Sequence, residues 1–134
     1  MRNTLMDFTL RKYKELLTSL LENGYKFITF EQYCAQKLAS SPNSLIALSP
    51  YIILRHDVDL KAANSLATAQ IEQALGIKAS YYFRVVPESN QPDIIRSIAE
   101  LGHEVGYHYE DMAIANGDAQ KAYAHFQKQL QYFR

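Results

Sequence analysis

Apolar positions along the chain follow two spacings, one typical of helices and one typical of strands. Five segments carry apolar side chains at intervals of three and four residues, which predicts amphipathic helices. Thr29 and Gln32 have the spacing of a capping box at the start of the second helix. Gly24, Gly76 and Gly102 stand where glycine commonly ends a helix. The predicted helices cover residues 9–22, 29–38, 62–75, 94–101 and 118–133.

Short apolar and β-branched runs separate these helices and predict buried strands. They cover residues 25–28, 51–60, 79–86 and 103–108. Strands that alternate with helices of this length indicate crossover connections and a parallel sheet. We therefore expect an α/β fold with a mainly parallel sheet of about four strands. Residues 39–50 are rich in Ser and Pro, which predicts a surface loop. The length of 134 residues fits a single domain, 1–134.

The segment 51–60, YIILRHDVDL, passes directly from an apolar run into ionisable residues. Side chains alternate along a strand, so Asp57 and Asp59 should project to one side while His56 and Val58 point to the other. Two neighbouring carboxylates repel each other unless a proton or a cation lies between them. The pair therefore predicts a metal site or an acid/base pair. The alternative is a loop whose aspartates cap the following helix.

Ionisable residues also follow the next two predicted strands. Arg84 ends one of them, and His108 with Glu110 ends the other. The carboxyl ends of parallel strands meet at one edge of a sheet, where sites are commonly built. We therefore expect Asp57, Asp59 and His108 to lie close together.

Two carboxylates and a histidine form a ligand set suited to a divalent metal, zinc above all, with manganese or cobalt as alternatives. Metal-bound water loses its proton near neutral pH and can attack a carbonyl. Hydrolysis is the chemistry implied, with Asp57 as general base and Asp59 and His108 as metal ligands. Glu110 is a further candidate ligand or an outer partner of the site. The remaining candidates are Arg84, which could hold a carboxylate or meet substrate; Tyr109, for substrate binding; and His56, more simply a packed histidine.

Composition excludes several classes of function. Lys and Arg number 14, as do Asp and Glu, and the basic residues are scattered, so the sequence offers no surface for nucleic acid. No apolar run reaches the ~18 residues of a membrane span, and the first residues lack the apolar core of a secretion signal, which predicts a cytoplasmic protein without a membrane partner. Cys34 has no cysteine partner and is expected to be buried.

Three segments resemble the polysaccharide deacetylases of the NodB-homology type. They are RHDVDL (residues 55–60), ASYYFRV (79–85) and GHEVGYHYED (102–111). The last is the most specific, in both composition and spacing. The resemblance implies a distorted barrel of seven parallel strands with outer helices, a metal held by one Asp and two His, and removal of acetyl groups from N-acetylated sugars.

The chain departs from that family in three ways. Val58 separates the two aspartates that the family places side by side, which shifts the base-then-ligand assignment by one residue. Met112 stands where a second metal-binding histidine is expected, which leaves Glu110 or water for that place. A barrel of this kind takes ~200 residues or more. The chain therefore corresponds to an incomplete domain, and we expect either a missing C-terminal half or self-association through open sheet edges.

Two other functions remain open at this point. An apolar strand followed by D-x-D also opens the haloacid-dehalogenase type of phosphotransferase, with the first Asp as nucleophile. In that group Gly-Thr or a similar pair follows, whereas Leu60 and Lys61 follow here. The other alternative is a non-catalytic structural or binding module that keeps the half-barrel without its chemistry.

Overall fold

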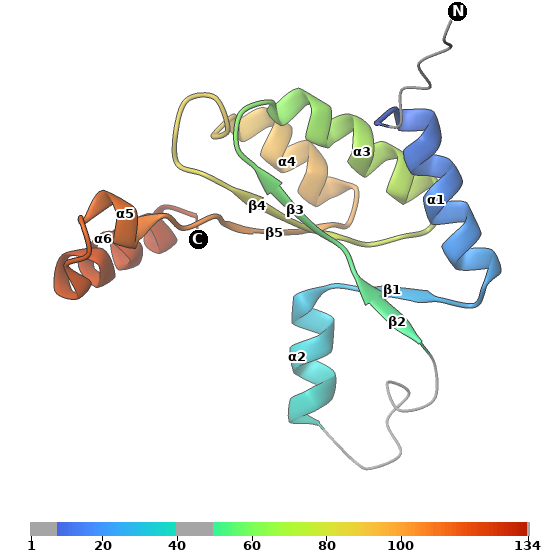
Figure 1. Ribbon diagram of the computed structural model, residues 1–134, viewed down its shortest axis with the longest axis horizontal. Coiled ribbons are helices and arrows are strands. Elements are labelled where there is room, and N and C mark those ends of the chain that lie inside the picture. The colour runs from blue at the N-terminus through green and yellow to red at the C-terminus, as the bar shows by residue number, and fades with distance from the viewer. Residues whose placement is uncertain (1–7, 40–49, 134) are drawn as a thin grey trace, which may run out of the picture.

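The computed structural model describes residues 8–39 and 50–133, and it has the expected α/β organisation (Figure 1). Helices and strands alternate along the chain, and all described strand pairs are parallel. Most of the predicted loop 39–50 lies outside the described residues. The helices are α1 (Leu10–Glu22), α2 (Phe30–Leu38), α3 (Ala62–Ala74), α4 (Pro92–Glu100), α5 (Asp111–Ile114) and α6 (Ala119–Tyr132). The strands are β1 (Lys26–Ile28), β2 (Tyr51–Ile53), β3 (Arg55–Val58), β4 (Ser80–Phe83) and β5 (Glu104–Tyr107).

The predicted strand 51–60 is in fact two short strands that belong to different sheets. β2 pairs with β1, whereas β3 begins a three-stranded sheet of order β3-β4-β5. Leu54 joins the two strands, and its carbonyl accepts a hydrogen bond of 2.9 Å from Ser80 N–H. The single-strand prediction is wrong because β1 and β4 meet successive halves of this extended stretch. No closed barrel forms among the described residues.

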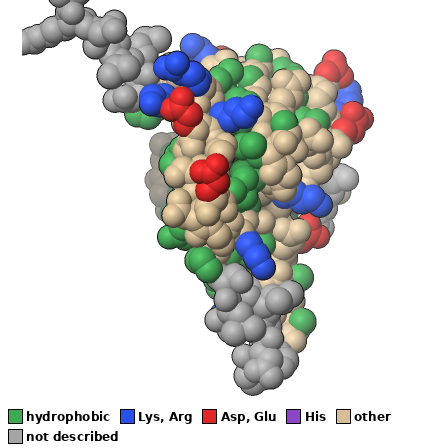
Figure 2. Space-filling model, turned by 90° about the vertical axis from the view of Figure 1, so that its right-hand side faces the viewer, with side chains coloured by type: hydrophobic (Ala, Val, Ile, Leu, Met, Phe, Trp, Pro, Cys, Tyr) green, Lys and Arg blue, Asp and Glu red, His purple; other side chains and the backbone are tan. Residues whose placement is uncertain are grey.

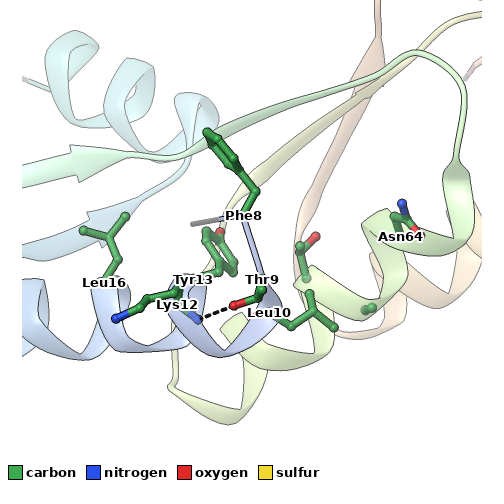
Figure 3. A pocket seen from close by; sticks show the side chains of 9 residues that line it. Phe8, Thr9, Leu10, Lys12, Tyr13, Leu16 and Asn64 are labelled. Carbon is green, nitrogen blue, oxygen red and sulfur yellow. Dashed lines mark hydrogen bonds between the residues drawn. The ribbon is translucent and has the colours of Figure 1, made fainter. Parts of the chain in front are cut away.

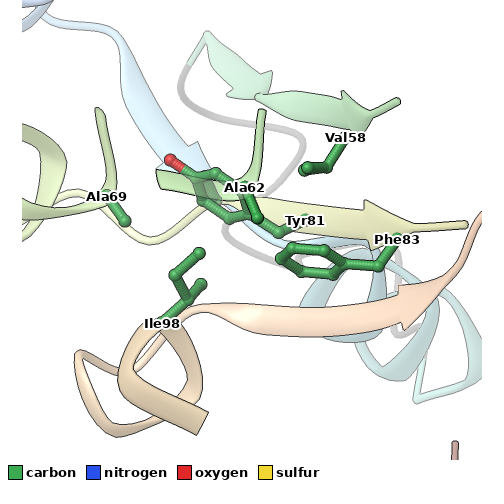
Figure 4. Packing of buried hydrophobic residues seen from close by; sticks show 7 residues of the cluster. Val58, Ala62, Ala69, Tyr81, Phe83 and Ile98 are labelled. Atoms are coloured by element: carbon green, nitrogen blue, oxygen red, sulfur yellow. The ribbon is translucent and has the colours of Figure 1, made fainter. Parts of the chain in front are cut away.

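The core lies between one face of the three-stranded sheet and the helices α3 and α4 (Figure 4). Val58, Tyr81 and Phe83 project from the strands and are fully or almost fully buried. Ala62 and Ala69 of α3 are completely buried against them, as the small residues on this helix predict. Ile98 completes the cluster from α4. This packing fixes which face of the sheet is apolar and leaves the opposite face to polar side chains.

Local sequence signals explain the helix boundaries. Thr29 accepts a hydrogen bond from Gln32 N–H, and the Gln32 side chain accepts one from Thr29 N–H, so the predicted capping box is confirmed. The prediction that Cys34 is buried is wrong. Its side chain is exposed, on a helix that has no fully buried residue. The short helix α5 is an element that the sequence did not predict.

Helix α1 buries only part of its predicted apolar side. Leu17 is buried, but Leu10 and Leu16 are half exposed. Both line a hollow of about 570 Å³ between the start of α1 and α3, together with Phe8 and Tyr13 (Figure 3). None of the predicted site residues lines this hollow.

Charged side chains are dispersed over the face of the molecule that Figure 2 shows. On the face shown in Figure 2, basic and acidic side chains alternate with apolar ones, and no patch of a single sign forms. This agrees with the formal net charge of zero. No described helix has the length and apolar content that spanning a membrane requires.

Candidate functional site

Asp57, Asp59 and His108 meet at the C-terminal edge of the three-stranded sheet, as the sequence predicts. His108 Nε2 lies 3.6 Å from Asp57 Oδ2 and 4.0 Å from Asp59 Oδ1. Asp57 belongs to β3, whereas His108 follows β5, so the contact spans the intervening strand β4. The two carboxylates are about half exposed and the imidazole is largely buried. We call these three side chains the carboxylate–histidine cluster.

The spacing of this cluster is close to what a small cation needs. Two donors that each lie about 2.1 Å from a tetrahedral zinc ion are about 3.4 Å apart. The separations of 3.6 and 4.0 Å exceed that value by about 0.2 and 0.6 Å. As the side chains stand, no group of three or more His, Cys, Asp or Glu within residues 8–39 and 50–133 forms a metal-binding arrangement. Small side-chain rotations would therefore be required for the cluster to hold a metal.

Arg55 orients the Asp57 carboxylate. Its Nε donates to Asp57 Oδ1 over 2.7 Å, which leaves Oδ2 facing His108. The guanidinium lies over the Tyr82 ring, 4.5 Å from the ring centroid. Tyr82 in turn lies over Gly106, which is its register partner on β5. A stack from Gly106 through Tyr82 to Arg55 thus sets the position of Asp57.

The absence of a side chain at Gly106 is what allows this stack. A Cβ built there would lie 2.7 Å from Tyr82 Cε1, closer than real Cβ atoms approach. We expect Gly106→Ala to displace the Tyr82 ring and to lower the free energy of unfolding by about 1–3 kcal/mol, the usual cost of overpacking. Chemical denaturation measures the loss. Gly117→Ala would provide a poor control because Gly117 has a positive φ. Ala99→Gln is a better one, because it adds a side chain of similar helix propensity at an exposed helical position. A Gly106→Ala variant as stable as the wild type would contradict the proposed stack.

Arg84 and Glu110 pair with each other next to the cluster. Glu110 Oε2 accepts a hydrogen bond of 2.9 Å from Arg84 Nε and forms an ion pair with Arg84 Nη2 at 2.7 Å. Arg84 therefore holds a carboxylate in place, which is one of the two roles considered for it. Glu110 and His108 line the same small cavity, of about 80 Å³, but Glu110 is engaged by Arg84.

A second histidine, His125, lines that cavity as well. It comes from the middle of α6, and nothing in the sequence around it distinguishes it. Its Nδ1 makes a very short hydrogen bond to the buried Asp111 carboxylate. The Tyr107 hydroxyl donates to the same carboxylate over 3.2 Å. Burial and the neighbouring Asp111 charge raise the pKa of Tyr107 to about 12. Only tertiary structure brings these residues together.

His56 lies on the opposite face of the sheet from the cluster, as strand alternation predicts. It stacks on Tyr81 with ring centroids 4.3 Å apart, and its Nε2 donates to Glu72 Oε1 over 2.6 Å. A role for His56 beside substrate or metal does not fit this position, since its partner is a buried carboxylate of α3. His103 is likewise structural: Ala79 N–H donates to its Nδ1 over 3.1 Å, and Nε2 lies 3.0 Å from the Ala69 carbonyl oxygen.

Glu72 is completely buried and is the centre of a network on this face. Besides His56, the hydroxyls of Tyr13 and Tyr81 donate to its carboxylate. Burial alone raises the pKa of Glu72, but hydrogen bonds from His56, Tyr13 and Tyr81 outweigh it and hold the pKa below its ordinary value. Burial and the Glu72 charge raise the pKa of both tyrosines. We call these four residues the Glu72 network; it was not predicted from the sequence.

Tyr109 is the predicted substrate-binding residue with the most accessible side chain. It is 62% exposed, and its ring meets Phe126 of α6 edge to face. Tyr107, by contrast, is buried between Phe126 and Phe133 and cannot meet a substrate without rearrangement. Tyr109 also lines an apolar groove of about 590 Å³ between α5 and α6.

Comparison of the chain with protein-family models, with curated proteins and with solved structures finds no match. The residues and their geometry therefore provide the basis for a function.

Proposed function

We propose that this chain forms the site of a metal-dependent hydrolase that resembles the polysaccharide deacetylases and removes N-acetyl groups from a carbohydrate. The convergence of Asp57, Asp59 and His108 carries the proposal, because carboxylates that precede His108 by 51 and 49 positions in sequence lie 3.6 and 4.0 Å from its Nε2. The likeness of residues 55–60, 79–85 and 102–111 to that family supports it.

The residues of the cluster have separate roles in this proposal. Asp59 and His108 would hold the metal, with zinc preferred and manganese or cobalt possible by ligand chemistry. A bound divalent ion supplies a water of lowered pKa and stabilises negative charge on the acyl oxygen. Asp57, held by Arg55 through one oxygen, has its second oxygen available to accept a proton from water. Tyr109, exposed beside the cluster, offers a surface on which a sugar ring can stack.

Asp59→Asn tests the metal assignment. We expect the purified variant to lose zinc, because an amide oxygen is a much weaker ligand than a carboxylate and carries no charge. Elemental analysis after dialysis measures the metal per chain, with the wild type expected near one. Asp93→Asn is the matched control, since Asp93 pairs only with Arg96 on the surface of α4 in the described structure. Unchanged zinc content in Asp59→Asn would remove Asp59 from the site.

Activity assays on the purified wild-type chain distinguish the proposed deacetylase from the two alternative functions. Release of acetate from an N-acetylated sugar, dependent on the bound metal, supports the deacetylase. Magnesium-dependent phosphatase activity supports a D-x-D phosphotransferase instead. If neither activity is found and no metal is retained, a structural or binding half-barrel remains.

Self-association belongs to the proposal as well. β5 is an outer strand of the three-stranded sheet, and β1 is an outer strand of the other. An outer strand presents backbone N–H and C=O groups to which another strand can pair. A second copy of the chain, or further sequence, would complete the sheet, and sedimentation gives the assembly mass that distinguishes a monomer from a larger species.

A further inference from the structure

We propose that Ser89 is a positioning residue for the carboxylate–histidine cluster, because its hydroxyl takes the place of a backbone hydrogen bond at the ends of β3 and β4. The effect of Ser89 on metal binding rests on the proposed function. The hydroxyl bridge between the two strands does not.

The Ser89 hydroxyl joins the ends of two neighbouring strands. Arg84 N–H, directly after β4, donates to Ser89 Oγ over 3.0 Å. Ser89 Oγ in turn donates to the carbonyl oxygen of Val58, the last residue of β3, in a very short hydrogen bond. Ser89 is completely buried, so solvent does not compete for either bond.

Without this hydroxyl, the parallel ladder would join the strands directly at the same position. The Leu54 carbonyl oxygen accepts from Ser80 N–H over 2.9 Å, where the two strands begin to pair. Hydrogen bonds in a parallel ladder are evenly spaced, and the strands stay in register as far as Val58. Four residues further along both strands, the equivalent bond would run from Arg84 N–H to the Val58 carbonyl oxygen. The hydroxyl stands between these two groups.

A turn after β4 holds Ser89 in place. Ser89 N–H and Asn90 N–H both donate to the Val86 carbonyl oxygen, over 3.1 and 2.7 Å. The Ser89 carbonyl oxygen accepts from Gln91 N–H over 2.9 Å. Because its backbone is held on both sides and its side chain is buried, Ser89 presents the hydroxyl at one position.

The bridge acts on the cluster through Val58, which lies between Asp57 and Asp59 in the sequence. Strand β4 is the common neighbour of β3 and β5. On the β5 side the ladder has no such bridge, and His108 N–H donates directly to the Phe83 carbonyl oxygen over 2.8 Å. The histidine is thus tied to β4 by a backbone bond, whereas the chain between the two aspartates is tied to it through one serine hydroxyl. The hydroxyl therefore helps to set the 3.6 and 4.0 Å separations between the carboxylates and the imidazole.

Ser89→Ala in the full chain removes the bridge. We expect zinc affinity, measured by competition with a chelator, to fall about 10-fold or more, the usual loss when an outer partner of a metal site is removed. Ser97→Ala is the matched control, because Ser97 Oγ also donates to a backbone carbonyl, that of Asp93, but in α4. Its zinc affinity should be unchanged.

A second readout needs no metal. Hydrogen exchange of the metal-free chain, followed by NMR, compares the Arg84 amide with the Ser80 amide of the same strand, whose bond to Leu54 stays intact in the variant. The ratio of the two exchange rates removes any general loss of stability. We expect Ser89→Ala to raise the ratio of Arg84 to Ser80 exchange about 10-fold or more, since a buried hydrogen bond is lost at one amide only. Ser97→Ala should leave the ratio unchanged.

If Ser89→Ala does not fold, Ser89→Cys fills the space with a thiol, a much weaker donor, and is read in the same way. In a folded variant, an unchanged exchange ratio would overturn the proposed bridge, and unchanged zinc affinity would overturn the positioning role. A wild-type chain that binds no zinc would contradict the proposed function, while the exchange ratio would still decide whether Ser89 holds the ends of β3 and β4 together.

Discussion

We expect Glu72→Gln to lower the free energy of unfolding by about 3 kcal/mol, in line with the loss of one partner from a buried charged network. The Glu72 carboxylate is fully buried and accepts hydrogen bonds from His56, Tyr13 and Tyr81. A glutamine has the same shape but only one acceptor oxygen, and its NH₂ group would face donors. Urea denaturation at neutral pH measures the difference.

The pH dependence of the stability lost in Glu72→Gln tests whether Glu72 is ionised in the folded protein. The pKa of Glu72 is lowered in the folded state, so its stabilising contribution is present above the unfolded value of about 4.3 and is lost as pH falls through the folded value. The difference in the free energy of unfolding between the wild type and Glu72→Gln should therefore become smaller in acid. Glu100→Gln, at an exposed position of α4, should change stability by less than about 0.5 kcal/mol. A difference that stays constant down to low pH would contradict an ionised Glu72.

Under the proposed function, Asp57→Asn should lower the rate of acetate release by about 10²–10⁴-fold, the usual contribution of a positioned general base. An amide cannot accept the proton from water. The ion pair between Asp57 and Arg55 is substantially exposed, so Asp57→Asn should lower the free energy of unfolding by no more than about 1 kcal/mol. Steady-state kinetics with an N-acetylated sugar, at matched zinc loading, measures the effect.

Zinc content distinguishes the two aspartates in this experiment. Asp57→Asn should retain metal, whereas Asp59→Asn should lose it. Asp93→Asn again serves as the control on an exposed aspartate. If Asp57→Asn keeps activity within a few-fold of the wild type, the base lies elsewhere and the assignment of Asp57 is wrong.

Local sequence patterns predicted most of the secondary structure. The capping box at Thr29 depends on contacts between residues three positions apart. The alanines of α3 lie on one face of a single helix. Both features can therefore be predicted without knowledge of the tertiary structure. The division of residues 51–60 into β2 and β3 could not be read in this way. It depends on where β1 and β4 run beside this stretch, which is a property of the sheet.

The same distinction applies to the candidate site. Alternation along a strand correctly placed Asp57 and His56 on opposite faces, and the rule for parallel sheets brought His108 to the aspartates. Glu72 and His125 carry no such signal. Each sits in a helix among ordinary neighbours, and its partners come from distant segments.

The sequence by itself determined the order of helices and strands, the parallel arrangement and the edge at which Asp57, Asp59 and His108 meet, because each follows from periodicity and from connections between neighbouring elements. Only the tertiary structure decided the partners of buried polar groups. Those partners depend on distances between segments far apart in the chain, such as the 2.6 Å between His56 of β3 and Glu72 of α3, and packing of the whole domain sets them.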